Sequence, residues 1–301
     1  MRHTDISTSN TEPQHPWMEQ TELADSEPDP PSSVPVSNPS SGCVIRGGSE
    51  PYLLRHRLSE HGVYRGRGLA SDSDVIIKAY LEQCGGERFK SECRAQERLT
   101  RGSHRNVLLM REALNTERYI IFPFLDGESL ETVLMRERRL CPEAVIDMAL
   151  GIGKGLVYSH ALGVIHRDIK PDNIMIHNGS SVIFDYDISV ILETEPSKEL
   201  ANAGTACYTA PERWQSLPAD HRVDIFSFGV VLYRAVTGVL PFDDETVTGI
   251  KDRILYAPLL LEAVPAAIAP ILLKMLAKDP QERYSKAKEV VAALKVVKGR
   301  V

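Results

Sequence analysis

The most informative segment of this sequence is His166-Arg167-Asp168-Ile169-Lys170-Pro171-Asp172-Asn173. Apolar residues precede and follow it, so these eight residues read as one short loop between two hydrophobic segments. The loop places an acid, a base and a carboxamide at fixed offsets, as phosphoryl transfer requires. Asp168 can accept the proton of an attacking hydroxyl, Lys170 can neutralise charge on the moving phosphoryl group, and Asn173 can ligate magnesium.

This loop resembles the catalytic loop of the eukaryotic-type (Hanks-type) serine/threonine protein kinase family, whose motif is H-R-D-x-x-x-x-N. A chance basic and acidic turn is the alternative, and it is disfavoured because eight consecutive positions fit. Further motifs of the family follow in its order and spacing, over about residues 52–298. The resemblance implies an α+β, two-lobed protein kinase-like fold, with a small antiparallel-sheet N-lobe that carries one main helix and a larger helical C-lobe.

Lys78 ends the apolar run Val75-Ile76-Ile77-Lys78, which is similar to the V-A-I-K strand of the family. A lysine at a strand end is usually just solvated. Here, however, Glu92 stands on the following predicted helix, where the family has the glutamate that pairs with this lysine, and Glu97 fits that position less well. The resemblance implies that Glu92 holds Lys78 against the α- and β-phosphates of ATP.

Asp185-Tyr186-Asp187 follows the apolar run Val182-Ile183-Phe184 and resembles the D-F-G motif of the family. The resemblance implies that Asp185 is the principal magnesium ligand. Asp187 departs from the motif, because it replaces a glycine that is free to adopt a positive φ. Aspartate tolerates that conformation better than most residues, but its charge adds to the acidity near the metal. The departure therefore bears on regulation and metal affinity more than on the reaction.

The sequence over residues 204–212 resembles the G-T-x-x-Y-x-A-P-E end of a kinase activation segment. The resemblance implies that Thr205 hydrogen-bonds Asp168 and Lys170 and so orders the catalytic loop. It also implies a buried ion pair between Glu212 and Arg283. Lys170 together with Thr205 is the pattern of serine/threonine kinases, which predicts hydroxyl acceptors of the Ser/Thr type.

The activation segment also offers candidates for regulation. Arg167 precedes the catalytic Asp168, and kinases with that arginine commonly need a negative group on this segment to balance it. Ser197 and Thr194 are the hydroxyls best placed to supply it after phosphorylation, while Glu199 could provide a fixed carboxylate. Phosphorylation is the favoured alternative, because phosphate carries up to about two charges and a carboxylate only one.

The nucleotide-binding residues are the weakest part of the resemblance. Phe122 stands at the gatekeeper position, and the hinge after it would contact adenine through the carbonyl of Pro123 and the backbone N–H and C=O of Leu125. Only Gly62 remains of the three glycines in the glycine-rich loop, which is about three residues short. Val63 falls in register with the valine of that motif. We therefore expect weak ATP binding that depends little on this loop.

Composition excludes several classes of protein. The chain has 301 residues, 43% of them hydrophobic, and a net charge of −6, without the basic patch of a nucleic-acid binder. Its five cysteines are scattered without ligand spacing, which predicts reduced thiols in a cytoplasm. The N-terminus has no apolar core suited to a signal peptide, and the longest apolar run, Ile225–Val236, is too short to cross a bilayer. We therefore expect a soluble, cytoplasmic protein.

A change in composition divides the chain near residue 50. Residues 1–50 are rich in Ser and Pro and hold eight acidic residues against two basic ones, so we expect a disordered tail. The protein kinase domain is predicted over residues 51–298. Its N-lobe would extend over about 51–124, its hinge over about 123–127 and its C-lobe over about 128–298.

Hydrophobic periodicity separates a strand-rich first part of this domain from a helical second part. The first part has one charged amphipathic helix, Glu87–Thr100, and the second has helical spacing from Val145 to Leu156. Residues 224–229 are similar to the start of the helix that supports the catalytic loop in the family. The predicted buried face of the first helix consists of Phe89, Cys93, Gln96 and Leu99. Strands are predicted at Tyr52–Leu54, Val63–Tyr64, Val75–Tyr80, Val107–Met110 and Tyr119–Phe124.

These motifs together predict a protein kinase that uses ATP and Mg²⁺, with Mn²⁺ as an alternative ion, and acts on Ser/Thr hydroxyls of protein substrates. The alternative is a pseudokinase, a nucleotide-binding or scaffolding module of the same fold, which the short loop, Ile76 and Asp187 favour. Retention of every group assigned to phosphate, metal or proton favours turnover. A small-molecule kinase is disfavoured, because Ala210-Pro211-Glu212 belongs to a platform for protein substrates. Neither nucleic acid nor a membrane is an expected partner.

Overall fold

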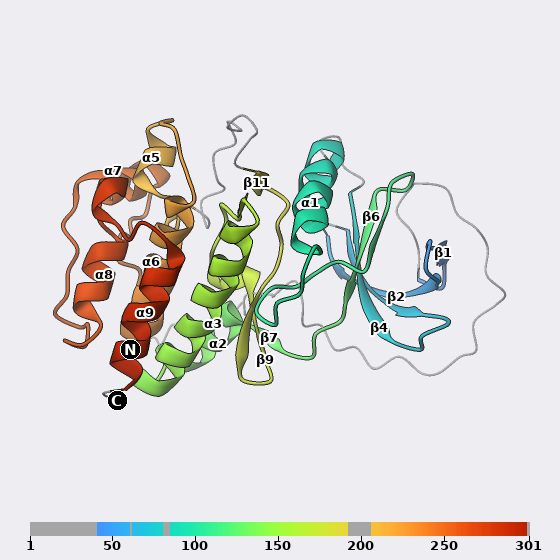
Figure 1. The fold of residues 1–301 in the computed structure, drawn as a ribbon, viewed down its shortest axis with the longest axis horizontal. Helices are drawn as coiled ribbons and strands as arrows, with labels where there is room; N and C mark the ends of the chain where they lie inside the picture. The colour runs from blue at the N-terminus through green and yellow to red at the C-terminus, as the bar shows by residue number, and fades with distance from the viewer. Residues whose placement is uncertain (1–40, 61, 81–84, 192–205, 300–301) are drawn as a thin grey trace, which may run out of the picture.

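A curled antiparallel sheet builds the first lobe of the protein (Figure 1). In this computed structural model, residues 41–60, 62–80, 85–191 and 206–299 are described. The sheet has the strand order β1-β2-β3-β4-β6-β5, and every neighbouring pair is antiparallel. The strands are β1 (Val44–Arg46), β2 (Pro51–Ser59), β3 (Val63–Gly68), β4 (Asp74–Ala79), β5 (Glu112–Leu114) and β6 (Tyr119–Pro123).

The two faces of this sheet bury different clusters, because side chains alternate along each strand. Val75 and Ile77 of β4 lie in a cluster with Tyr52 and Leu54 of β2. The other face packs against helix α1 (Gly85–Leu99), which stands between the sheet and the second lobe in Figure 1. The sequence predicted that this helix buries one face, and the prediction is confirmed. All four residues of that face are buried, namely Phe89, Cys93, Gln96 and Leu99.

Helices dominate the second lobe (Figure 1). Helix α3 (Pro142–Ala161) packs against α6 (Arg222–Thr237) and α9 (Ala287–Lys298), and its apolar residues at helical spacing are buried as predicted. Among the described residues, no helix combines the length and the apolar character that a membrane span requires. The other α-helices of the described residues are α2 (Leu130–Glu137), α5 (Pro211–Trp214), α7 (Val247–Tyr256) and α8 (Ala269–Met275).

Short strands at the junction of the lobes fix the loop that carries the candidate site. The loop over residues 166–173 connects β8 (Val164–Ile165) to β9 (Ile174–His177). β8 pairs with β11 (Val190–Ile191), and β9 lies between β7 (Glu128–Ser129) and β10 (Ser180–Ile183). Both ends of the loop are therefore held by strand pairing.

The predicted end of the disordered tail at residue 50 is wrong, because the folded part of the chain begins earlier. β1 lies within it and pairs with β2, and Cys43 and Ile45 are buried. Glu50 accepts hydrogen bonds from the backbone N–H groups of Ala70 and Ser71, both at 2.8 Å. The short apolar run around β1 was hidden by the polar composition on either side of it. The rest of the predicted tail, residues 1–40, lies outside the described part of the chain.

The predicted strand Val107–Met110 is wrong. Val107 makes only an isolated parallel bridge to Ile183, and the edge strand of the sheet is β5 instead. The backbone of this segment bonds to other partners, since Leu108 N donates to Ile183 O at 2.8 Å and Met110 N donates to Gln96 Oε1 at 2.9 Å. The apolar run is therefore covered by α1 and the second lobe rather than by a strand ladder.

The hairpin between β2 and β3 depends on a glycine at its end. Gly62 has φ +80°, and a Cβ built there would lie 2.6 Å from the carbonyl oxygen of Ala79. The carbonyl of Gly62 also accepts a hydrogen bond from Ala79 N at 2.8 Å, so the two backbones are held close together. Gly179, in the β9–β10 turn, has φ +69°, but a Cβ there meets nothing within 4 Å.

We expect Gly62→Ala to lower the free energy of unfolding by about 1–3 kcal/mol more than Gly179→Ala does. In both variants a residue with a Cβ must adopt a left-handed backbone conformation, at a cost of roughly 1–2 kcal/mol each. Only Gly62→Ala also brings its Cβ too close to the carbonyl oxygen of Ala79. Urea denaturation of the two variants measures the difference. Equal losses would show that Ala79 moves aside and that the close approach is dispensable.

Candidate active site

Lys78 and Glu92 form an ion pair between the sheet and helix α1. Lys78 lies opposite Val63 on β3 and Ile120 on β6, so strand pairing on both sides fixes its position. Its Nζ lies 2.8 Å from Glu92 Oε2. Glu92 is fully buried, and its other oxygen accepts the backbone N–H of Tyr186 at 3.3 Å. The structure thus brings together the pair that the sequence suggested.

Three carboxylates surround the Lys78 amine. Besides Glu92, Asp185 Oδ1 contacts it directly, and Asp187 Oδ2 lies 4.0 Å from it and equally far from Arg88 Nη1. Burial opposes the charge on Lys78, but Asp185 and Glu92 outweigh burial and raise its pKa. Burial raises the pKa of Glu92 to about 7, and it also raises the pKa of Asp187. The pKa of Asp185 is lowered instead, because the nearby charge of Lys78 outweighs burial there. The arrangement leaves an excess of negative charge that cations can balance.

The catalytic-loop residues converge on one oxygen of Asp168. Lys170 Nζ lies 2.9 Å from Asp168 Oδ2, and Asn173 Nδ2 donates to the same oxygen and to the Asp168 carbonyl, each at 2.9 Å. Asp168 Oδ1 is buried and has no hydrogen-bond partner among the described residues. A fixed carboxylate with one unused oxygen can accept a proton.

A buried carboxylate on α6 holds this loop in a strained conformation. Arg167 has φ +69°, which an L-residue adopts only where its surroundings enforce it. Asp224 accepts the backbone N–H groups of His166 at 2.9 Å and Arg167 at 2.8 Å, and Arg213 donates to the Arg167 carbonyl at 2.9 Å. Burial opposes the charge on Asp224, but the contact of its carboxylate with His160 Nε2 at 2.8 Å, together with His166 and the backbone N–H of Arg167, outweighs burial and lowers its pKa.

Tyr186 anchors the Asp185 segment in the second lobe. It is fully buried, its hydroxyl shares a hydrogen bond with Ser159 Oγ at 2.8 Å, and its ring lies 4.4 Å from that of His166. The positive φ in this segment occurs at Asp185, at +66°, and not at Asp187. Asp187 therefore does not use the conformational freedom of the glycine that it replaces in the motif.

Asp185 and Asn173 fit a magnesium ion. Both can offer hard oxygen ligands, and because Asn173 Nδ2 bonds to Asp168, its Oδ1 is left for other contacts. In the described part of the chain, no group of three or more His, Cys, Asp or Glu side chains is suited to hold a metal. Magnesium does not require such a cage, because it is commonly bound by one or two protein ligands together with substrate phosphates.

The covering loop offers little to a nucleotide. It is reduced to residues 60–62 between β2 and β3, with Val63 buried opposite Lys78. At the hinge, the backbone N–H and C=O of Leu125 make no hydrogen bond to any described residue, which leaves both free for a ligand. Pro123 ends β6 and pairs with Val75 of β4.

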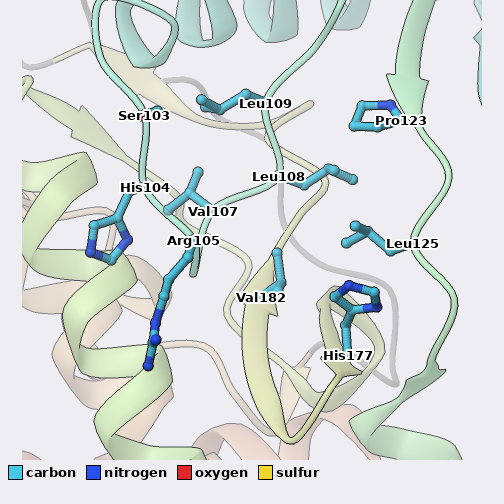
Figure 2. Close-up of a pocket in the computed structure, with 10 residues that line it drawn as sticks. All are labelled: Ser103, His104, Arg105, Val107, Leu108, Leu109, Pro123, Leu125, His177 and Val182. Atoms are coloured by element: carbon cyan, nitrogen blue, oxygen red, sulfur yellow. The ribbon is translucent and has the colours of Figure 1, made fainter.

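A pocket of about 330 Å³ lies beside the hinge, and neither Asp168 nor Asp185 lines it. Figure 2 shows the side chains of Pro123 and Leu125 on one side of it and His104 and Arg105 on the other. Of the residues assigned to nucleotide binding, only Pro123 and Leu125 line it. It is therefore distinct from the site that would hold phosphate.

The end of the activation segment is fixed by the predicted ion pair. Arg283 Nη1 and Nη2 donate to the two oxygens of Glu212, each at 2.7 Å, and both side chains are buried. Thr205 and the candidate regulatory residues Thr194, Ser197 and Glu199 lie outside the described residues. Their roles are predictions from the sequence.

Sequence reasoning missed the polar contacts that two side chains make beside Glu92, although it predicted that Gln96 is buried. The Tyr80 hydroxyl donates to Glu92 Oε2, and Gln96 bonds to the segment between α1 and β5. Spacing could have found both. Tyr80 is two residues after Lys78, directly after the end of β4, and Gln96 is one helical turn after Glu92.

Comparison with known proteins agrees with this geometry. The family model described as "Protein kinase domain" matches residues 62–294. A probable serine/threonine-protein kinase of Clostridium perfringens is 30% identical over 264 residues, which cover 82% of this chain and 38% of that protein. A probable serine/threonine-protein kinase of Clostridium acetobutylicum is 32% identical over 266 residues, which cover 83% of this chain and 40% of that protein.

Serine/threonine-protein kinase pkn3 of Myxococcus xanthus is 30% identical over 271 residues, which cover 82% of this chain and 50% of that protein. The match therefore spans half or less of the length of each of these relatives. This chain belongs to the protein kinase family and, within it, to the Hanks-type serine/threonine kinases.

Proposed function

We propose that this protein transfers the γ-phosphate of ATP to Ser or Thr hydroxyls of protein substrates. The observation that carries the proposal is the asymmetry of the Asp168 carboxylate. Oδ2 is held by Lys170 and Asn173, whereas Oδ1 is buried without a partner among the described residues. A buried acceptor left unsatisfied is unfavourable for stability, which points to a functional reason for it.

The proposed reaction assigns one role to each group. Asp168 Oδ1 accepts the proton of the substrate hydroxyl as its oxygen attacks the γ-phosphorus, and the bond to the bridging oxygen breaks so that ADP leaves. Lys170 balances charge on the transferred group, and Lys78, held by Glu92, binds the α- and β-phosphates. Thr205 is assigned to ordering the catalytic loop.

The proposed cofactors are ATP and Mg²⁺, with Mn²⁺ as an alternative ion. Asp185 and Asn173 would hold the metal, which when bound neutralises phosphate charge. Adenine would form hydrogen bonds with the carbonyl of Pro123 and with the backbone N–H and C=O of Leu125. Gly62 and Val63 would cover the nucleotide. The weak covering loop supports weak ATP binding.

The proposed partners are protein substrates with Ser or Thr acceptors. The net charge of −6 gives no support to nucleic acid as a partner. A cytoplasmic location is proposed from the scattered cysteines, because Cys43, Cys93, Cys141 and Cys207 form no disulfide among the described residues.

A transfer assay tests the proposal. Purified protein is incubated with radiolabelled ATP, Mg²⁺ and matched basic peptides that carry Ser, Thr or Tyr as their one acceptor. We expect label on the Ser and Thr peptides and none on the Tyr peptide. Calorimetric titration with ATP and Mg²⁺ runs beside it, because binding without transfer would overturn the proposal in favour of a pseudokinase.

A further inference from the structure

Helix α1 presents two buried polar side chains to the rest of the molecule. Glu92 and Gln96 are both fully buried and lie one helical turn apart, so they share a face of the helix. Buried polar groups need hydrogen-bond partners, and their partners lie on separate elements. The way these two residues are held therefore determines where α1 sits.

Gln96 ties the helix to the segment that precedes β5. Its Nε2 donates to the carbonyl of Leu108 at 3.3 Å, and its Oε1 accepts the backbone N–H of Met110 at 2.9 Å. A carboxamide that donates and accepts at once fixes both the position and the orientation of its backbone partners. An apolar side chain at this place would fill the space but leave both backbone groups unpaired.

Tyr80 gives Glu92 a partner besides Lys78. Its hydroxyl donates to Glu92 Oε2, the oxygen that also faces Lys78 Nζ. The Tyr80 ring is buried and packs edge-on against Phe89 of α1, with the ring centres 5.7 Å apart. Both its ring and its hydroxyl thus contact the helix.

We propose that Tyr80 and Gln96, here called the α1 clamp, are positioning residues that hold Glu92 against Lys78 before nucleotide binds. The inference rests on the proposed function, because Lys78 matters here as the residue assigned to the phosphates of ATP. Neither clamp residue contacts the reacting atoms. They act through Glu92, which keeps the amine of Lys78 in one place.

Two variants remove the polar groups and keep the shape. Tyr80→Phe removes one hydroxyl, and Gln96→Met replaces the carboxamide by an unbranched apolar side chain. We expect both variants to lower kcat/KM for ATP by about tenfold or more, with KM for the peptide unchanged, because small displacements of positioned groups have large effects on rate. We also expect the amides of α1 to exchange hydrogen about tenfold faster in ATP-free protein.

Matched controls separate positioning from stability. Tyr119 lies beside Ala79 on the neighbouring strand, and its hydroxyl makes no hydrogen bond to a described residue, so Tyr119→Phe controls for Tyr80→Phe. Leu54→Val perturbs the buried cluster on the opposite face of the sheet and controls for loss of stability. We expect wild-type exchange in α1 for both controls.

Each outcome decides one question. Wild-type exchange in α1 for Tyr80→Phe and Gln96→Met would overturn the clamp, as would equal acceleration in Leu54→Val at matched stability. If Gln96→Met does not fold, Tyr80→Phe alone tests the proposal. If the wild-type protein transfers no phosphate, the proposed function fails, and the exchange comparison still supports or overturns the clamp.

Discussion

Replacing Asp168 with asparagine is expected to lower kcat for phosphoryl transfer by about 10²–10⁴-fold. Asparagine keeps the shape of the side chain and an oxygen that Lys170 and Asn173 can contact, but it cannot take up a proton. Binding of ATP with Mg²⁺ should remain near wild type, because Asp168 is not among the groups assigned to phosphate or metal. Single-turnover transfer of radiolabelled phosphate to a Ser peptide measures the loss, and calorimetry measures nucleotide binding.

Asp147→Asn is the matched control for this variant. It removes the same charge from the surface of α3, where Asp147 pairs with Lys298 and both side chains are more than half exposed. An exposed ion pair contributes little to stability, so this variant should transfer phosphate at the wild-type rate. Wild-type kcat in Asp168→Asn would instead show that another group accepts the proton and that Oδ1, which has no partner among the described residues, has no catalytic role.

Local motifs made the centre of this site predictable. The loop over residues 166–173 brings its acid, amine and amide together within eight residues, so its chemistry could be read without knowledge of the fold. Helix α1 was predictable because its buried face repeats at helical spacing. The pairing of Lys78 with Glu92, 14 residues apart, came only from resemblance to a family.

Contacts that join distant segments were predicted only where the family resemblance supplied them, as it did for Glu212 and Arg283. Asp224 lies 57 residues from Arg167, whose backbone it holds, and no local pattern indicates such a bond. The error at Val107–Met110 has the same origin. Its residues have the composition of a strand, but their backbone partners are Ile183 and Gln96, which periodicity cannot identify.

Replacing Arg283 with methionine is expected to lower the free energy of unfolding by about 3–5 kcal/mol. The change leaves Glu212 as a buried carboxylate without its partner. Arg283 also donates to the carbonyls of Ala277 at 2.9 Å, Arg222 at 3.1 Å and Lys278 at 3.2 Å, and these groups lose a donor as well. Urea denaturation of the wild type and the variant measures the loss.

The control is an exposed pair of similar geometry. Arg136 contacts the two oxygens of Glu128 at 2.6 and 2.9 Å, but its side chain is 54% exposed. We therefore expect Arg136→Met to cost less than about 1 kcal/mol. Losses of equal size in the two variants would show that burial does not determine the contribution of the Arg283 pair.

The double variant Glu212→Leu/Arg283→Met distinguishes two causes of instability in Arg283→Met. One is the lost attraction between the two side chains, and the other is the burial of the Glu212 carboxylate without a partner. With both charges removed, no buried carboxylate remains, so we expect it to be more stable than Arg283→Met alone. Its transfer rate should stay low in spite of that recovery, because Glu212 lies in the first turn of α5 at the end of the activation segment, and the ion pair fixes where that segment ends. Recovery of both stability and rate would show that the pair serves only to satisfy its own charges.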